Sequence, residues 1–207
     1  MAPRRRPTTR RECVPVRTQA ELERVLAGGG IPICVGDGDF SLTGSPQVWA
    51  GERAHVRVGD SAVGVACDTA TIVAAGSASV AAADAATVQA YDSSSVVALH
   101  ETTVEAHGTA RVEAYGKATV SAWDSSSVAG ADHSRIQAYD SSSVEAFGSA
   151  EVVASGTAHV VAHGQATVQA HDRATVEAHG EVHVEAFDSA EVVALDDVSI
   201  HRHVHEP

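Results

Sequence analysis

The chain has 207 residues, a formal net charge of −13 at pH 7 and three cysteines. This length allows one elongated domain with a small end piece, and Cys13, Cys34 and Cys67 lack the density and pairing of a disulfide framework. No apolar run approaches the length of a membrane span, and no apolar segment follows Arg4–Arg6 as a secretory signal requires. We therefore expect a cytoplasmic protein with no membrane contact.

The first segment, residues 1–17, is predicted to be a disordered basic arm. It is poor in apolar residues, and five arginines fall within its first eleven positions. Such an arm can touch the phosphate groups of a nucleic acid or another acidic surface. It can equally be a solubilising tail, which is the reading that we favour.

Residues 18–44 are predicted to cap the domain that follows. Thr18 to Leu26 is expected to be a helix, because Thr18 and Glu21 match a capping box and the glycines at 28–30 end the apolar pattern. Residues 31–35 and 40–42 are expected to be irregular lead-in strands. The stretch from Ala20 through Phe40 resembles the opening of right-handed β-helix proteins such as phage tailspikes and polysaccharide lyases. That resemblance implies a capping role and not hydrolysis.

From Ser45 to Val204 the chain divides into twenty blocks of eight residues with no insertion or deletion. The fourth position is Val or Ile except at Gly64, the sixth is almost always Ala, and the second is small. Residues two apart on a strand share a face, so these three positions point inward together. Gly or Asp at the eighth position supplies turn chemistry. The pattern predicts short strands separated by tight corners.

Alternate octads differ at their first position, which makes the coil sixteen residues long. One set is almost purely Ser or Thr and follows Gly or Asp; it comprises Ser61, Ser77, Ser93, Thr109, Ser125, Ser141, Thr157 and Ser189, with Arg173 as the exception. We predict an all-β parallel β-solenoid over residues 45–200, with two facing sheets, about ten coils and a short N-terminal capping helix. Ten coils at a strand separation of about 4.8 Å give a rod of roughly 50 Å.

Residues 201–207 are predicted to be a polar C-terminal tail, because Arg202 occupies a place that Ala should hold. His201, His203 and His205 alternate along this tail. That spacing can gather imidazoles round a metal ion, although terminal histidines that bind nothing specific are the reading that we favour. We expect no bound cofactor.

Aromatic and imidazole rings recur at the seventh position and give a candidate interaction stripe. Its members are Tyr91, His107, Trp123, Tyr139, His171 and Phe187, interrupted by Ser155. Rings stacked one coil apart can simply stabilise the corner. If they face solvent, a stripe of this length suggests a partner or dimer surface.

A second column, Thr71, Thr87, Thr103 and Thr119, lies beside the Ser/Thr ladder and continues as Arg135 and Glu151. The sixteen-residue coil with Gly/Asp–Ser corners is similar in organisation to bacterial ice-nucleation proteins and other ice-binding β-solenoids. That resemblance implies water ordering on a flat threonine face. The alternative is that Ser and Thr satisfy hydrogen bonds at corners and sheet surfaces, which we favour.

The body of the chain is acidic, with seven basic residues against twenty-two acids after residue 44. A regularly charged rod can mimic duplex DNA, as some pentapeptide-repeat β-helices do for gyrase, or can simply be soluble. We find no nucleophile elbow, phosphate loop or zinc-spaced cysteine set. The sequence favours a non-enzymatic structural or interaction module that forms a homo-oligomer or binds a protein partner. Ice binding and acidic DNA mimicry are the alternatives.

Overall fold

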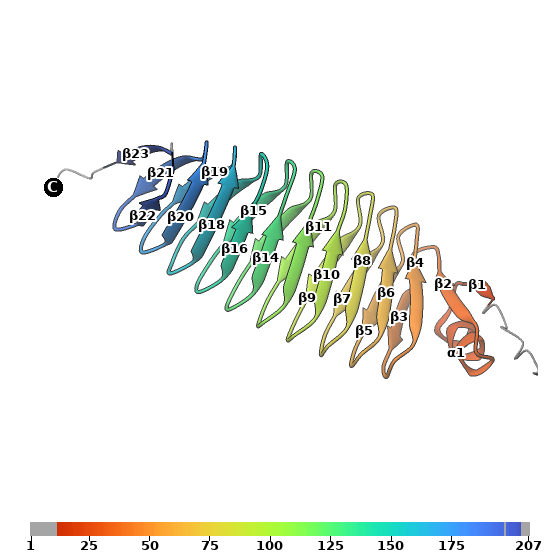
Figure 1. The fold of residues 1–207 in the computed structure, drawn as a ribbon. Helices are drawn as coiled ribbons and strands as arrows, with labels where there is room; N and C mark the ends of the chain where they lie inside the picture. Colours follow the sequence, from red (N-terminus) through yellow and green to blue (C-terminus); the bar gives the residue numbers. More distant parts are fainter. Residues whose placement is uncertain (1–11, 197, 204–207) are drawn as a thin grey trace, which may run out of the picture.

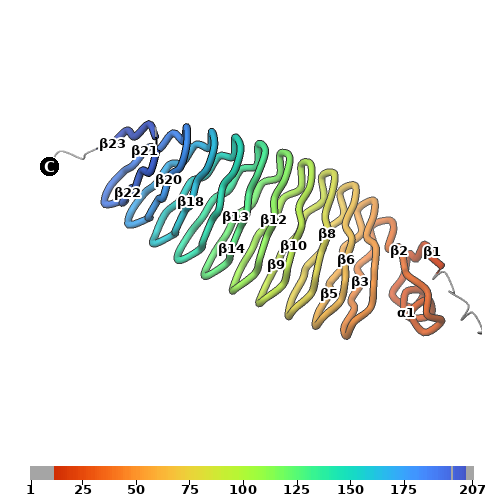
Figure 2. Tube along the Cα trace, viewed as in Figure 1, coloured from red at the N-terminus to blue at the C-terminus, as the bar shows by residue number. Residues whose placement is uncertain are grey.

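In a computed structural model, which describes residues 12–196 and 198–203, the chain is a parallel β-solenoid of about twelve turns. Figure 1 shows the strands stacked along a rod, with the single helix at the N-terminal end and β23 at the other. The tube in Figure 2 follows one flattened coil after another without a break in the stacking. The predicted fold class is confirmed.

The strands form two sheets in which alternate strands are hydrogen-bonded neighbours. The twelve-stranded sheet contains β1 (Cys13–Val16), β2 (Ile31–Cys34), β4 (Gln47–Ala50), β6 (Val63–Ala66), β8 (Ser79–Ala82), β10 (Ser95–Ala98), β12 (Arg111–Ala114), β14 (Ser127–Gly130), β16 (Ser143–Ala146), β18 (His159–Gly164), β20 (Thr175–Gly180) and β22 (Glu191–Ala194). The eleven-stranded sheet contains β3 (Asp39–Leu42), β5 (His55–Val58), β7 (Thr71–Ala74), β9 (Thr87–Ala90), β11 (Thr103–Ala106), β13 (Thr119–Ala122), β15 (Arg135–Ala138), β17 (Glu151–Ala154), β19 (Thr167–Ala170), β21 (His183–Phe187) and β23 (Ser199–His203).

Pairing between coils is parallel and in register at sixteen residues. Val104, for example, lies beside Val88 on one side and Val120 on the other. Most strands occupy octad positions three to six. Positions seven and eight, together with positions one and two of the next octad, form the corners. The corner after each strand of the eleven-stranded sheet carries the Ser/Thr ladder, and we call it the serine corner. The corner after each strand of the twelve-stranded sheet is called the mixed corner.

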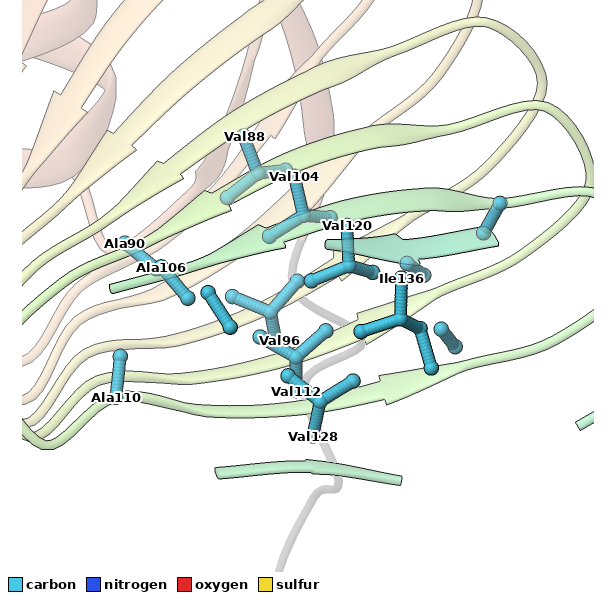
Figure 3. Packing of buried hydrophobic residues seen from close by; sticks show 14 of the residues in the cluster. Val88, Ala90, Val96, Val104, Ala106, Ala110, Val112, Val120, Val128 and Ile136 are labelled. Atoms are coloured by element: carbon cyan, nitrogen blue, oxygen red, sulfur yellow. The ribbon is translucent and has the colours of Figure 1, made fainter. Parts of the chain in front are cut away.

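The core is a thin layer of Val and Ala between the two sheets, as the octad pattern predicts. Figure 3 shows Val88, Val104, Val120 and Ile136 of one sheet facing Val96, Val112 and Val128 of the other. All seven side chains are buried. Because no large side chain separates the sheets, the interior holds little besides these rows and the alanines beside them.

The solenoid is longer than predicted at its N-terminal end. Strands β2 and β3, expected to be irregular, pair in register with β4 and β5. Strand β1 lies inside residues 1–17, the predicted arm, and pairs with β2 from Cys13 to Val16. The predicted boundary at residue 17 is therefore too late. The remainder of the arm, residues 1–11, lies outside the described residues.

The C-terminal boundary also moves. Strand β23 pairs with β21 through His203, so His201 to His203 belong to the last coil and not to a tail. Backbone pairing continues past Arg202 because a strand needs no apolar side chain to make its ladder bonds.

Helix α1 (Gln19–Ala27) lies where the capping box predicts it. The Thr18 side chain accepts a hydrogen bond from the N–H of Glu21 at 3.3 Å, and the Glu21 carboxylate accepts one from the N–H of Arg17 at 2.8 Å. The Arg17 N–H bond lowers the pKa of Glu21. Leu22 is buried, and α1 contacts β1, β2 and β3. In the described part of the chain, no helix has the length and apolarity to cross a membrane.

Candidate functional site: the corners and the apolar face

The corner carboxylates are held by the preceding coil. At the serine corner, Asp124 has a φ of 59° and its Oδ2 accepts a hydrogen bond from the N–H of Gly108 at 2.9 Å. Equivalent bonds join the aspartates at 60, 68, 84, 92, 132, 140, 172, 188 and 196 to the residue sixteen positions earlier. Asp is tolerated in the left-handed conformation, and here its carboxylate also satisfies a backbone donor.

Five of the eight members of the Ser/Thr ladder donate their hydroxyl protons to backbone carbonyls, and Ser61 instead bonds the hydroxyl of Ser45 at 2.7 Å. Ser77 Oγ bonds the carbonyl of Asp60 at 3.0 Å, and Thr109 Oγ1 bonds that of Asp92 at 3.0 Å. Ser93, Ser141 and Thr157 make the same contact. This geometry agrees with the interpretation that the hydroxyls satisfy hydrogen bonds at the corners. The protons of these five hydroxyls are donated within the protein.

The candidate interaction stripe is a stack of half-buried rings along the serine corner. Ring centroids are 5.2 Å apart for Tyr91 and His107, 6.2 Å for His107 and Trp123, and 4.0 Å for Trp123 and Tyr139, with planes within 13° of parallel. His171 and Phe187 continue the column at 4.5 Å beyond Ser155. The ring faces contact one another, so mainly ring edges are left for any partner.

The column at the mixed corner is more exposed than the stripe chosen from the sequence. Leu99, Tyr115 and Phe147 are exposed there, and Phe147, His163 and His179 stack at 5.1 and 4.8 Å. The negative charge of Glu113, which also accepts a hydrogen bond from the Tyr115 hydroxyl at 3.2 Å, raises the pKa of that phenol. The residues at octad position seven predict a ring column at each corner. The octad spacing does not predict which of the two columns has the more exposed side chains.

One side of the rod carries most of the exposed apolar surface. Of nine exposed large apolar side chains among the described residues, only Val153 lies on the eleven-stranded sheet. The other eight lie on the twelve-stranded sheet or its mixed corner: Trp49, Val63, Val97, Leu99, Tyr115, Phe147, Val193 and Leu195. We call this set the apolar face. Exposed apolar side chains gathered on one side of a protein are typical of interaction sites.

A hollow of about 340 Å³ lies on this face over β10, β12 and β14. Val97 and Ala129 line it together with Arg111, Glu113 and Ser127. The hollow thus combines apolar side chains with one cation and one carboxylate.

The C-terminal histidines extend the ring columns. His203 stacks on Phe187 with centroids 4.4 Å apart, and His201 lies 5.2 Å from His183. His205 lies outside the described residues. In residues 12–196 and 198–203, no group of three or more His, Cys, Asp or Glu is placed to hold a metal ion. His201 and His203 thus make ring contacts with the preceding coil.

The threonine column of the eleven-stranded sheet ends in an ion pair. Thr103 and Thr119 pair across β11 and β13, and the next two members, Arg135 and Glu151, join at 2.9 Å. Four threonines are therefore followed by two charged side chains on the same face.

The three thiols differ in exposure. Cys13 is exposed, and Cys34 is buried under the cap, which raises the pKa of its thiol to about 12. Partial burial, with the charge of Asp84, also raises the pKa of Cys67. All three are free, so no disulfide joins the described strands.

No family model, no curated protein and no solved structure matches this chain. The likeness to ice-nucleation-type solenoids and to the cap of right-handed β-helix proteins accordingly stays a prediction.

Proposed function

We propose that this chain is a non-enzymatic structural module that binds protein, either a second copy of itself or a different partner, through the apolar face. The single observation that carries the proposal is the one-sided distribution of exposed apolar side chains along the rod. A rigid sheet holds these side chains in place before binding, which lowers the entropy lost on association.

The other surface features support the same proposal because they are occupied within the chain. Corner hydroxyls donate to carbonyls, corner carboxylates accept backbone N–H bonds, and rings stack on rings. These groups stabilise a long, regular scaffold. Such a scaffold offers a partner a repeated surface, in which each coil adds a similar contact.

Two valines allow a matched test. Val97 on the apolar face and Val153 on the opposite sheet are 37% and 38% exposed. Val97→Lys is expected to weaken self-association or partner binding by about tenfold or more, since burying an ammonium group is costly. Val153→Lys should leave it nearly unchanged. Light scattering over a concentration series, with a pull-down on the same three proteins, measures both effects.

A strict monomer at high concentration that retains no partner in the pull-down would overturn the proposal. Equal weakening by the two lysine variants would place the binding surface elsewhere.

A second candidate, acidic DNA mimicry, is favoured by the rows of oriented corner carboxylates. Asp132 and Asp140, for example, are fixed by N–H bonds at 3.0 and 3.2 Å on opposite corners. The mimic is expected to inhibit a DNA-binding enzyme, with inhibition that fades as salt rises from about 50 to 500 mM. Inhibition that is absent or independent of salt would remove this candidate.

A further inference from the structure

The outward side chains of the twelve-stranded sheet form two straight columns, because its strands pair in register at sixteen residues. From β4 to β22, octad position three supplies every sixteenth residue from Gln47 to Glu191, and we call this set column three. Octad position five supplies every sixteenth residue from Trp49 to Val193, which we call column five. Every member of the two columns is exposed or half-buried. These side chains are therefore the outer surface of the sheet.

Column five contains only two kinds of side chain. Seven of its ten members are Trp, Val or Ala, and the other three are Glu113, Glu145 and Glu177. On the strands that carry these glutamates, the members of column three are Arg111, Ser143 and Thr175. Each glutamate thus shares its strand with a side chain that has a hydrogen-bond donor.

The part of this surface nearest the N-terminal cap carries no charge. On β4, β6, β8 and β10, the two columns hold only apolar, serine and glutamine side chains. Trp49, Val63 and Val97 are exposed there. Depletion of charged side chains is typical of the centre of protein–protein interfaces.

We propose that two copies of this chain pack their twelve-stranded sheets face to face, with the rods pointing the same way and a two-fold axis running along the rods between them. This inference rests on the proposed function and names one partner for it. The axis sets column three of each copy against column five of the other at the same coil. The facing strands then run in opposite directions, in two aligned layers.

Charge complementarity favours this arrangement. Arg111 is the one lysine or arginine in the two columns, and it faces Glu113 of the second copy. The symmetry makes this ion pair twice. The other two glutamates face uncharged hydroxyl side chains, in the pairs Glu145 with Ser143 and Glu177 with Thr175. From β4 to β22, no two residues of like charge oppose each other.

A two-fold axis across the rods is unfavourable. It sets column five against itself, and that column holds only glutamates and apolar side chains. Each covered glutamate would then oppose either another glutamate or an apolar side chain, which leaves its charge unpaired. With the axis at β12, Arg111 would also oppose its own copy. Charge therefore favours rods that point the same way.

The hollow of about 340 Å³ over β10, β12 and β14 lies at the charged pair, because Arg111 and Glu113 both line it. The Glu113 carboxylate accepts a hydrogen bond from the Tyr115 hydroxyl at 3.2 Å and has lone pairs left for a second donor. Since equal coils face each other, the hollows of the two copies also face each other. They leave room for each guanidinium group to reach the opposite carboxylate.

The area of the sheet predicts a weak dimer that does not grow. Ten strands of four residues, about 4.8 Å apart, cover roughly 600 Å² in each copy, or about 1,200 Å² in total. This value is at the lower end of the range for specific interfaces, so we expect dissociation in the micromolar range. A two-fold contact uses the sheet of each copy once, so assembly stops at the dimer.

Exchange of charge between two copies is the first test, with the mass of the full chain measured by light scattering from about 1 to 500 μM. Arg111→Glu sets carboxylates against carboxylates, and Glu113→Arg sets guanidinium groups against each other. Each single variant is expected to raise the dimer dissociation constant by about tenfold or more. An equimolar mixture of the two should dimerise nearly as well as the wild type, because every carboxylate then faces a guanidinium group. Arg57→Glu, on the exposed side of the eleven-stranded sheet, is the matched control and should have no effect.

Spin labels give the orientation. In a chain with its three cysteines replaced, Ser61 and Ser189 are labelled one at a time; both are exposed at the serine corner, and eight coils separate them. In rods that point the same way, each label lies at the same coil as its copy, so both should give similar separations of roughly 30 Å or less. An axis across the rods would put at least one of the two labels about 38 Å or more from its copy along the rod.

A dimer that both single variants weaken, that their mixture restores and in which both labels give similar short separations supports the inference. Single variants that dimerise like the wild type, a mixture that stays monomeric, or a label beyond about 38 Å overturns it. The proposed function then still stands if Val97→Lys weakens binding. A wild-type monomer at every concentration also overturns the inference. In that case, a different partner whose binding Val97→Lys weakens would leave the proposed function standing, and the lack of any partner would remove both.

Discussion

At the scale of single residues, two pairs of core residues differ from the usual octad pattern, and in each pair a glycine faces an isoleucine. Gly130 stands where Ala is usual, and a Cβ there would overlap Cδ1 of Ile136, which itself replaces Val. Gly64 and Ile72 repeat the arrangement, with 3.0 Å between the imagined Cβ and Cδ1. Each glycine makes room for the extra methyl group of an isoleucine across the core, and at Gly130 and Ile136, which replace Ala and Val, the total volume is conserved.

The pairing predicts non-additive stability. Gly130→Ala alone should destabilise the protein by about 1–3 kcal/mol through overpacking. Ile136→Val alone should cost about 1 kcal/mol, and the double variant should lie close to the wild type because it restores the common octad. Urea unfolding of the four proteins measures the coupling, and simple addition of the two single effects would contradict it.

The corner aspartates combine a backbone conformation with a hydrogen bond, and substitutions separate the two. Asp124→Asn keeps both a left-handed preference and an acceptor oxygen, whereas Asp124→Gly keeps only the conformation and Asp124→Ala keeps neither. We expect stability to fall in the order Asn, Gly, Ala, with Ala about 1–2 kcal/mol below the wild type. Thermal unfolding gives the order. An alanine variant as stable as the glycine variant would refute the conformational part.

At the scale of elements, the cap depends on Gln19, which bonds both polar groups of Ser41. A helix that merely covered β3 would leave those groups unpaired at the edge of the sheet, where a second chain can add a strand. The capping box predicts α1, but no local pattern shows that the first side chain of the helix completes a sheet.

The buried thiol of Cys34 reports on this cap. Burial raises its pKa to about 12, so near pH 8 it stays protonated and reacts only when the end of the rod opens. With Cys13 and Cys67 replaced by Ser, Gln19→Ala should speed labelling of Cys34 by about tenfold, the equivalent of roughly 1.4 kcal/mol from two lost hydrogen bonds. Glu23→Ala, which removes only a contact to the Gln19 side chain, is the control. An unchanged labelling rate in Gln19→Ala would show that the cap holds without this side chain.

At the scale of the whole molecule, the repeat predicts the coil length, the parallel stacking and the inward residues. It does not predict the first strands. Strands β2 and β3 keep the eight-residue phase, but Pro32 and Phe40 stand where Val is expected, so the pattern is hidden. Strand β1 is out of phase because α1 is inserted between it and β2. The octad pattern predicts the structure well inside the regular coils. It predicts the first strands poorly, because residues outside the pattern form them.

Surface roles were harder to predict than the fold. Octad position places Tyr91 and Tyr115 alike, yet the first stacks half-buried at the serine corner and the second is exposed at the mixed corner. The difference arises from neighbours sixteen residues away, not from the octad itself. The apolar face therefore emerged only from the folded arrangement.

The central claim is that two octads form each coil, and one distance tests it directly. Spin labels at Arg57 and Gln169, in a cysteine-free chain diluted with unlabelled protein, are separated by seven coils of the eleven-stranded sheet. Two octads per coil predict a separation of about 34 Å. A single sheet with one octad per strand would place the same labels fourteen strands apart, at about 67 Å, and that result would contradict it.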